Sequence, residues 1–394
     1  MKLPLYGPIK ILKNTQLLND TNVIRLRSIS NLNELCNQDF RLVKNRSDIE
    51  YAKLKNDNYI FCVGDFFNAS DIDTFQFIIQ VDAKFEYLED GDIIGINPNG
   101  SGFRSLYRHS SLHNSFLVTE QCNHYCLMCS QPPKRVDDSW LLNEIMDSIP
   151  LIDGKPSSLG FTGGEPLTNA DKFIKVLEVC RDLLPSTGLH VLTNGRAFSN
   201  SSVANAWANL KHNDLMAGIP IYSSNDTLHD YIVQSAGAFD ETIMGILQLK
   251  ERKQRVEIRL VLHALTTPRL YETCEWFSRN FPFVDHIALM GLENTGFAIA
   301  NHNELWVDPI EYKFDLGRSV ELLNSRGIRT SIYNLPRCVI PSNVWSFAKQ
   351  SISDWKQGFL EICSDCIERP NCSGFFTSGR PKEIKGIKPF LVSQ

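Results

Sequence analysis

Residues 115–129 read SFLVTEQCNHYCLMC, a short apolar run followed by three closely spaced cysteines. The run is rich in apolar and β-branched residues and is typical of a short buried strand. Cys122, Cys126 and Cys129 follow it in a Cys-x3-Cys-x2-Cys arrangement, so the loop directly after the strand carries all three. A strand that ends in potential ligands is the first unit of a pattern that continues along the chain.

Strand-like and helix-like segments alternate from about residue 114 to residue 292. Helices between apolar strands provide the long crossovers that parallel neighbours need, so the pattern predicts an α/β fold with a parallel sheet of six β/α units. Ligands are expected beyond the carboxyl ends of the strands. The expected strands are 115–120, 158–162, 189–193, 217–222, 256–263 and 284–291. The expected helices follow Asp137 and Asp138 and cover 170–184, 201–212, 240–253 and 269–280.

Two further regions flank this core, which we assign to residues 114–300. Residues 1–113 contain short β-rich runs and predict a small, β-rich accessory domain whose function the sequence does not reveal. Residues 301–394 read as an irregular, cysteine-rich C-terminal extension.

The overall composition is that of a globular protein, with 43% hydrophobic and 22% charged residues. A net charge of −5 argues against a general nucleic-acid binder. Neither a targeting segment nor an apolar run long enough for a bilayer is apparent, so we expect a cytoplasmic protein without a membrane partner. In a reducing compartment, clustered cysteines indicate metal ligands rather than disulfides.

The three cysteines at 122–129 supply soft thiolate ligands, which favour an iron–sulfur cluster or zinc. A [4Fe–4S] cluster held by three cysteines keeps one iron without a protein ligand, and an open coordination position is typical of a working metal. A structural zinc ion would need a fourth ligand, for which His124 is the candidate. Both alternatives remain open on spacing alone.

A second group of four cysteines lies in the C-terminal extension. Its members are Cys338, Cys363, Cys366 and Cys372. Four thiolates can fully ligate a cluster or a zinc ion, so we expect a metal site here without being able to name the metal from spacing. The other four cysteines are scattered among apolar neighbours and are expected to be small buried side chains.

The cysteine motif, together with FTGGEPL at 161–167, resembles the signature of the radical SAM superfamily. The resemblance implies a partial (β/α)6 TIM-like barrel, in which S-adenosylmethionine (SAM) chelates the open iron of a [4Fe–4S] cluster. A reduced cluster would then cleave SAM to methionine and a 5′-deoxyadenosyl radical, which abstracts hydrogen from the substrate. The residue before the third cysteine is usually aromatic in this superfamily and is Met128 here.

The resemblance also assigns roles around SAM. The amino group would lie at the GGEP residues, and other contacts would come from positions near the ends of later strands. Each later position has a structural alternative: a turn at Asn194, a helix cap at Ser223 and an ion pair at Arg259. No catalytic side chain is identified. The expected SAM-binding residues are Gly163, Gly164, Glu165, Pro166, Thr193, Asn194, Ser223, Arg259 and Met290, with Glu293 beside Met290 near the adenine.

A narrower resemblance is to the HxsC family of radical SAM maturases from His-Xaa-Ser peptide systems. It is carried by LHNSFLVTEQCNHYCLMCSQPPK at 112–134, YNLPRCVIP at 333–341, SDWK at 353–356 and CSGFF at 372–376. It implies a ribosomally made precursor peptide (a RiPP precursor) with His-Xaa-Ser repeats. The implied partners are a second radical SAM protein (HxsB), a small protein (HxsD) and an electron donor such as flavodoxin or ferredoxin.

By analogy with other peptide-modifying radical SAM enzymes, the C-terminal cysteines would hold an auxiliary [4Fe–4S] cluster. Two alternatives remain for the function: a radical SAM enzyme acting on a small molecule or RNA, and a non-catalytic partner that presents the precursor to a second maturase. The sequence does not indicate which bond is made or broken on the substrate.

Overall fold

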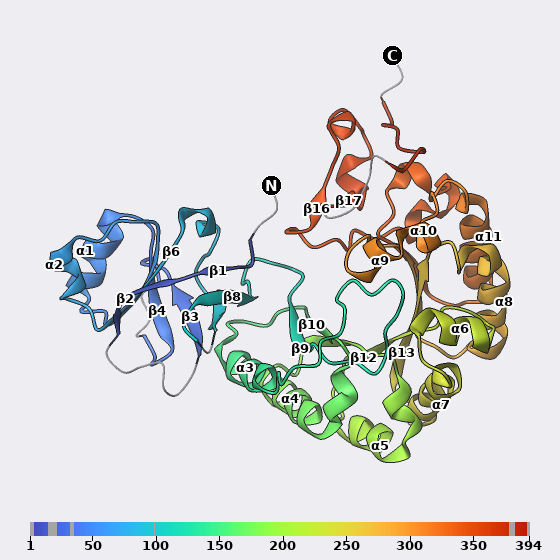
Figure 1. The fold of residues 1–394 in the computed structure, drawn as a ribbon, viewed down its shortest axis with the longest axis horizontal. Helices are drawn as coiled ribbons and strands as arrows, with labels where there is room; N and C mark the ends of the chain where they lie inside the picture. Colours follow the sequence, from blue (N-terminus) through green and yellow to red (C-terminus); the bar gives the residue numbers. More distant parts are fainter. Residues whose placement is uncertain (1–3, 15–21, 32–34, 98, 378–382, 392–394) are drawn as a thin grey trace.

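The structure is a computed structural model that describes residues 4–14, 22–31, 35–97, 99–377 and 383–391. The core is a seven-stranded, all-parallel sheet in the order β15-β14-β13-β12-β11-β10-β9. Figure 1 shows its helices as an arc on the outer side of the curved sheet. The strands are β9 Ser115–Thr119, β10 Ser158–Gly163, β11 Gly188–Leu192, β12 Leu215–Pro220, β13 Arg255–Leu262, β14 His286–Gly291 and β15 Thr330–Tyr333. The helices are α3 Trp140–Ser148, α4 Ala170–Leu183, α5 Ser201–Asn209, α6 Asp226–Val233, α7 Ala238–Glu251, α8 Leu270–Asn280, α9 Phe297–Ala300, α10 His302–Leu305 and α11 Lys313–Ser325.

The α/β fold with a parallel sheet is therefore confirmed, and all six expected strands are present within two or three residues of their expected ends. Period-two alternation along β13 explains its two faces: Val256, Ile258 and Leu260 pack into the core beneath the helices. Glu257 and Arg259 alternate with them and face the inside of the curved sheet. The sheet is open, because no strand pairing joins β9 to β15 among the described residues.

The expectation of an irregular segment from residue 301 onward is wrong over 313–333. Helix α11 packs on α8 through Leu316, Val320 and Leu323, which recur at helical spacing, and leads into β15. β15 pairs in parallel with β14 and adds the seventh strand to the sheet. Its sequence, TSIY, is short and begins with two hydroxyl residues, so it lacks the apolar run that marks the other strands.

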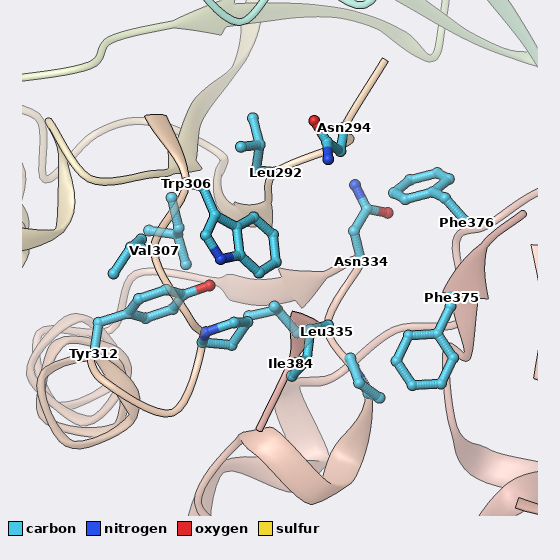
Figure 2. A pocket seen from close by; sticks show the side chains of 13 residues that line it. Leu292, Asn294, Trp306, Val307, Tyr312, Asn334, Leu335, Phe375, Phe376 and Ile384 are labelled. Carbon is cyan, nitrogen blue, oxygen red and sulfur yellow. The ribbon is translucent and has the colours of Figure 1, made fainter. Parts of the chain in front are cut away.

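The rest of the C-terminal segment folds over the carboxyl ends of β14 and β15. It contains short 3₁₀ turns and the two-residue strands β16 Gln357–Gly358 and β17 Phe375–Phe376, which pair antiparallel. Phe375 and Phe376 line a cavity together with Trp306 and Leu335 of the core (Figure 2). The C-terminal segment is therefore part of the wall at the end of the sheet where ligands are expected.

The N-terminal residues form a second, eight-stranded sheet in the order β1-β8-β7-β3-β4-β5-β6-β2. Strands β3, β4, β5 and β6 are mutually parallel, and the outer pairs are antiparallel. The strands are β1 Tyr6–Pro8, β2 Lys10–Asn14, β3 Val23–Arg27, β4 Asp39–Val43, β5 Tyr59–Val63, β6 Phe77–Val81, β7 Ile93–Ile96 and β8 Gly102–Tyr107. Two helices, α1 Arg46–Leu54 and α2 Ala69–Ile72, accompany them.

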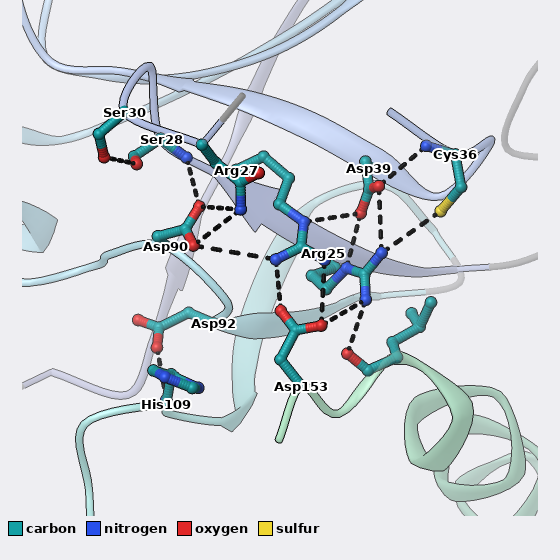
Figure 3. A network of polar contacts seen from close by, with 12 residues as sticks. Arg25, Arg27, Ser28, Ser30, Cys36, Asp39, Asp90, Asp92, His109 and Asp153 are labelled. Carbon is teal, nitrogen blue, oxygen red and sulfur yellow. Dashed lines mark hydrogen bonds and ion pairs between the residues drawn. The ribbon is translucent and has the colours of Figure 1, made fainter. Parts of the chain in front are cut away.

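An ion-pair network attaches this sheet to the core (Figure 3). Asp153, which follows α3, accepts hydrogen bonds from the guanidinium groups of Arg25 and Arg27 on β3. Arg25 also donates to Asp39 at 2.7 Å, and this contact with the guanidinium holds the pKa of Asp39 below its usual range even though burial opposes the shift. Because the network is largely buried, it fixes the two sheets relative to each other.

No helix in the described part of the chain is long and apolar enough to cross a membrane.

Candidate functional site

A cavity of about 380 Å³ lies at the carboxyl ends of the core strands. It brings together residues that are up to 234 positions apart in the sequence, from Cys122 to Lys356. Of the residues expected from the sequence, the following line it: Cys122, Cys126, Cys129, Gly163, Gly164, Thr193, Asn194, Arg259, Met290 and Glu293. Glu165, Pro166 and Ser223 do not line it.

The cysteine loop is held from two sides by backbone hydrogen bonds. Tyr125 N donates to Val233 O at 3.1 Å and Leu127 N to Ile232 O at 2.9 Å, which ties the loop to the end of α6. On the other side, Phe297 N donates to Cys129 O at 2.8 Å. These bonds fix the path of the loop without using the thiols.

The thiols make only local contacts: Cys129 Sγ donates to Gln131 O at 3.0 Å, and Cys122 Sγ accepts from His124 N at 3.4 Å. Burial raises the pKa of Cys122 to about 11 and also raises the pKa values of Cys126 and Cys129. The thiols are thus protonated without a metal, and metal binding would displace their protons. Three thiols on one cavity wall, with room beside them, fit a [4Fe–4S] cluster that has an open iron.

His124, the candidate fourth ligand for zinc, also lines the cavity. Its Nδ1 lies 4.0 Å from Cys126 Sγ, and its Nε2 has no hydrogen-bond partner among the described residues. Burial lowers the pKa of His124 to about 3, so the imidazole is neutral. Among the described residues, no group of three or more His, Cys, Asp or Glu side chains is arranged to hold a single metal ion.

The two glycines of the GGEP segment allow the end of β10 to pass close to the cysteine loop. Gly163 has φ +144°, which side chains rarely adopt, and a Cβ on Gly164 would lie 1.9 Å from Gln121 O. Gly164 N donates to Thr119 O and Glu165 N to Gln121 O, each at 2.8 Å. Glycine is therefore required at both positions, and the backbone here is exposed to the cavity.

Glu165 lies behind the cavity wall rather than on it. Its carboxylate accepts hydrogen bonds from Thr193 Oγ1 and Asn194 N, both at 2.6 Å, and from Leu167 N at 2.9 Å. Pro166 begins a buried 3₁₀ turn beside it, Pro166–Asn169. The carboxylate thus holds the turn after β11 in place.

Ser223 takes a local structural role. It is buried, and its hydroxyl accepts a hydrogen bond from Asn225 N at 3.0 Å, just before α6. The sequence analysis offered a helix cap as the structural alternative for Ser223. The N-cap of α6 is Asn225, and Ser223 accepts a hydrogen bond from the backbone of that cap residue.

Arg259 projects into the cavity from a buried polar network inside the sheet. Its Nη1 donates to Glu257 Oε1 at 2.6 Å, and His286 Nδ1 lies 2.6 Å from the other carboxylate oxygen. Burial opposes ionisation of Glu257, but hydrogen bonds from His190 and His286 and the charge of Arg259 outweigh it and lower its pKa. An ionised Glu257 therefore holds the guanidinium of Arg259 in a fixed orientation at the cavity wall.

Lys356, Asn334 and Tyr222 also line the cavity, and the sequence analysis did not select them. Lys356 comes from the C-terminal segment, and its Nζ lies 3.2 Å from Glu293 Oε1. Its neighbour Asp354 forms a 2.8 Å ion pair with Arg108 of the N-terminal sheet. The sequence did contain a signal for Lys356, because SDWK at 353–356 is one of the segments that carry the resemblance to the HxsC family.

The four C-terminal cysteines, Cys338, Cys363, Cys366 and Cys372, line one separate small cavity together with Arg337, Arg369 and Lys388. Backbone N–H groups point at their sulfurs: Arg337 N lies 3.4 Å and Gly374 N 3.5 Å from Cys372 Sγ, and Phe390 N lies 3.4 Å from Cys366 Sγ. N–H donors and cationic side chains stabilise the negative charge of ligating thiolates. All eleven cysteines lie in the described part of the chain and are free. Of the four scattered cysteines expected to be buried, Cys62, Cys180 and Cys274 are buried, whereas the expectation is wrong for Cys36, which is exposed in the loop before β4.

Comparison with known proteins agrees with this geometry. Residues 116–277 match the family model described as Radical SAM superfamily. An uncharacterized protein of Methanocaldococcus jannaschii is 26% identical over 191 residues, which cover 47% of this chain and 61% of that protein. The chain thus spans less than two thirds of that relative.

Solved structures with a similar arrangement include SuiB of Streptococcus suis bound to S-adenosylmethionine, at 14% identity and a TM-score of 0.45, covering 56% of this chain and 50% of that one. Another is coproporphyrinogen III oxidase (HemN) of Escherichia coli, at 16% identity and a TM-score of 0.44, covering 56% and 54%. The family match includes the cysteine loop, the GGEP segment and the turn after β11. Residues 116–277 of this chain therefore resemble the radical SAM superfamily.

Proposed function

We propose that this protein is a radical SAM enzyme that modifies a ribosomally made precursor peptide. The observation that carries the proposal is the shared cavity: Cys122, Cys126 and Cys129 line it together with the adjacent glycine backbone of the GGEP segment, within the region that matches the family model. When bound, a [4Fe–4S] cluster and SAM would supply a 5′-deoxyadenosyl radical as the hydrogen-abstracting group.

The residues of the chain would position SAM from several sides. Gly163 and Gly164 expose backbone atoms to the methionine amino group, and the Arg259 guanidinium is suited to its carboxylate because it is held in a fixed orientation by Glu257. Thr193 and Asn194 form the wall between these groups, and Met290 provides an apolar contact for the adenine ring.

Cys338, Cys363, Cys366 and Cys372 would hold an auxiliary [4Fe–4S] cluster. Support comes from their position around one cavity and from the backbone N–H groups directed at Cys372 Sγ and Cys366 Sγ. Burial raises the pKa of Cys338, so this site too would bind a metal with release of protons.

The substrate we propose is a His-Xaa-Ser precursor peptide, with HxsB and HxsD as partner proteins and flavodoxin or ferredoxin as the electron donor. The support is the sequence resemblance, together with a C-terminal segment that contributes Lys356 to the central cavity. The eleven free cysteines are consistent with a reducing compartment, and we propose a cytoplasmic location.

The test uses anaerobically purified, reconstituted protein, assayed with SAM, a reductant and the precursor peptide. A change in precursor mass that requires SAM, and that is lost in the Cys122/Cys126/Cys129→Ala variant, is expected. An unchanged precursor, with turnover of a metabolite or an RNA instead, would contradict the peptide assignment. The absence of any SAM cleavage would favour a non-catalytic precursor-binding role.

A further inference from the structure

A second, smaller cavity lies beside the central one, where β13, β14 and β15 end (Figure 2). Its volume is about 50 Å³. Its walls are mostly apolar and aromatic. They include Leu262, Leu292, Trp306, Tyr312, Phe375 and Phe376. Figure 2 shows the Trp306 and Tyr312 rings on one side and the two phenylalanines on the other.

Asn294 is the feature of this cavity that the fold does not explain. The residue is 3% exposed, and neither Nδ2 nor Oδ1 of its side chain has a hydrogen-bond partner among the described residues. An unsatisfied buried amide destabilises a protein, because it loses its hydrogen bonds to water without replacement. The residue is therefore expected to have a partner that the described residues do not supply.

The chemistry of the walls restricts that partner. Asn294 offers one donor group and one acceptor, so it is complementary to a group that also has both. No Asp, Glu, Lys, Arg or His side chain is among the residues that line the cavity. A charged ligand would lose its hydration without a compensating charge, so the ligand must be neutral.

The position of the cavity connects it with the proposed reaction site. Leu292 and Asn334 line both cavities, so they form the wall between them. Glu293, which lines the central cavity, is followed directly by Asn294. A group bound at Asn294 is therefore one side-chain layer away from the region where SAM would lie.

We propose that this cavity binds one neutral amide group of the substrate, while the small apolar side chain next to it lies at the cavity mouth. The Asn294 carboxamide would pair with the amide through two hydrogen bonds, and the apolar group would pack against Trp306 and Phe376. An engineered cavity of about 150 Å³ holds benzene, so a cavity a third of that size has room for one amide group and leaves the neighbouring side chain at its mouth. This inference rests on the proposed function only in taking the substrate to be a peptide.

The test is saturation-transfer difference NMR on the anaerobically purified, reconstituted protein with N-acetyl-L-valinamide as the probe. Transfer to the valine methyl protons is expected. Free valine, which is a zwitterion, and N-acetylvaline, which is an anion, are expected to give none. Equal transfer to all three compounds would overturn the proposal.

The variant Asn294→Leu removes both hydrogen-bonding atoms and keeps a similar volume. It is expected to bind the probe about tenfold more weakly, and its melting temperature is expected to rise because the unsatisfied amide is gone. The matched control is Asn303→Leu on the exposed side of α10, which should leave probe binding unchanged. Unchanged binding in Asn294→Leu, or an equal loss in both variants, would overturn the proposal.

A parallel assay of SAM cleavage separates the two claims. Probe binding by a protein that fails to cleave SAM would support this cavity and contradict the proposed enzymatic function. Cleavage of SAM by a protein that fails to bind the probe would support the proposed enzymatic function and contradict the role of this cavity.

Discussion

The carboxylate of Glu165 accepts a 2.6 Å hydrogen bond from the hydroxyl of Thr193, and so joins the ends of β10 and β11 behind the central cavity. The same carboxylate accepts a second 2.6 Å bond from Asn194 N. Because Thr193 and Asn194 line the cavity while Glu165 does not, Glu165 is a positioning residue in this structure.

Replacement of Glu165 by glutamine tests this role. The carboxamide has one acceptor oxygen, so its NH₂ group must face at least one of the backbone or hydroxyl donors that now bond to the carboxylate. We expect a loss of about 2 kcal/mol in the free energy of unfolding and about tenfold weaker SAM binding, measured by equilibrium dialysis with reconstituted protein.

Thr193→Val is the matched control, because it removes only one of the three hydrogen bonds to the carboxylate and should have a smaller effect on both quantities. Wild-type SAM affinity in a destabilised Glu165→Gln protein would show that Glu165 supports the fold and not the cavity.

Glu257→Gln tests the buried network beneath Arg259. The pKa of Glu257 is lowered in the folded chain, so its stabilisation is present above the unfolded pKa of about 4.3 and is lost as the pH falls through the folded value. We expect the variant to be about 3 kcal/mol less stable than the wild type at pH 7. The difference should shrink as the pH falls below 4.3.

Denaturant titration of both metal-free proteins across this pH range measures the difference. A constant difference at every pH would contradict the ionised state of Glu257.

Asp153→Asn tests the link between the two sheets. Asp153 accepts hydrogen bonds from two nearly buried arginines, Arg25 and Arg27, and hydrogen bonds between charged groups are stronger than neutral ones. We expect a loss of about 1–2 kcal/mol in urea denaturation and faster proteolytic cleavage between the N-terminal sheet and the core.

The control is Asp182→Asn, which breaks an exposed ion pair with the neighbouring Arg181 and should change stability by less than about 0.5 kcal/mol. Equal effects of the two substitutions would mean that the network does not hold the sheets together.

Cys363→Ala/Cys366→Ala tests the C-terminal metal site. Two four-iron clusters give about eight iron atoms per chain in the wild type, and the variant should retain about four. Cys274→Ala is the control, because this cysteine is fully buried in the core and should not affect iron content. Zinc in place of half of the iron in the wild type would contradict the auxiliary cluster.

Local sequence patterns were sufficient to predict the strands from β9 to β14 and the place of the cysteine loop. Each of these strands contains two or more bulky apolar residues, and the three cysteines are closely spaced in sequence, so no tertiary information was needed. β15 was missed because TSIY is short and half polar; its pairing with β14 depends on the tertiary fold. α11 was missed although Leu316, Val320 and Leu323 have helical spacing.

The site was predictable to the extent that a residue type implies its role. Glycines at 163 and 164 are required by a close backbone approach, which their sequence context indicated. Glu165 looked like a ligand because its carboxylate is suited to an amino group, yet its three partners come from the folded chain. The approach of Lys356 to Glu293, 63 positions away, could not be inferred from either local sequence.

The most direct test of the central claim is the formation of 5′-deoxyadenosine from SAM by the reconstituted, reduced protein without substrate. The account predicts 5′-deoxyadenosine from the wild type and from a Cys180→Ala control, whose altered cysteine is buried in the core. It predicts none from the Cys122/Cys126/Cys129→Ala variant. No 5′-deoxyadenosine from an iron-loaded wild-type protein, or equal amounts from wild type and triple variant, would contradict it.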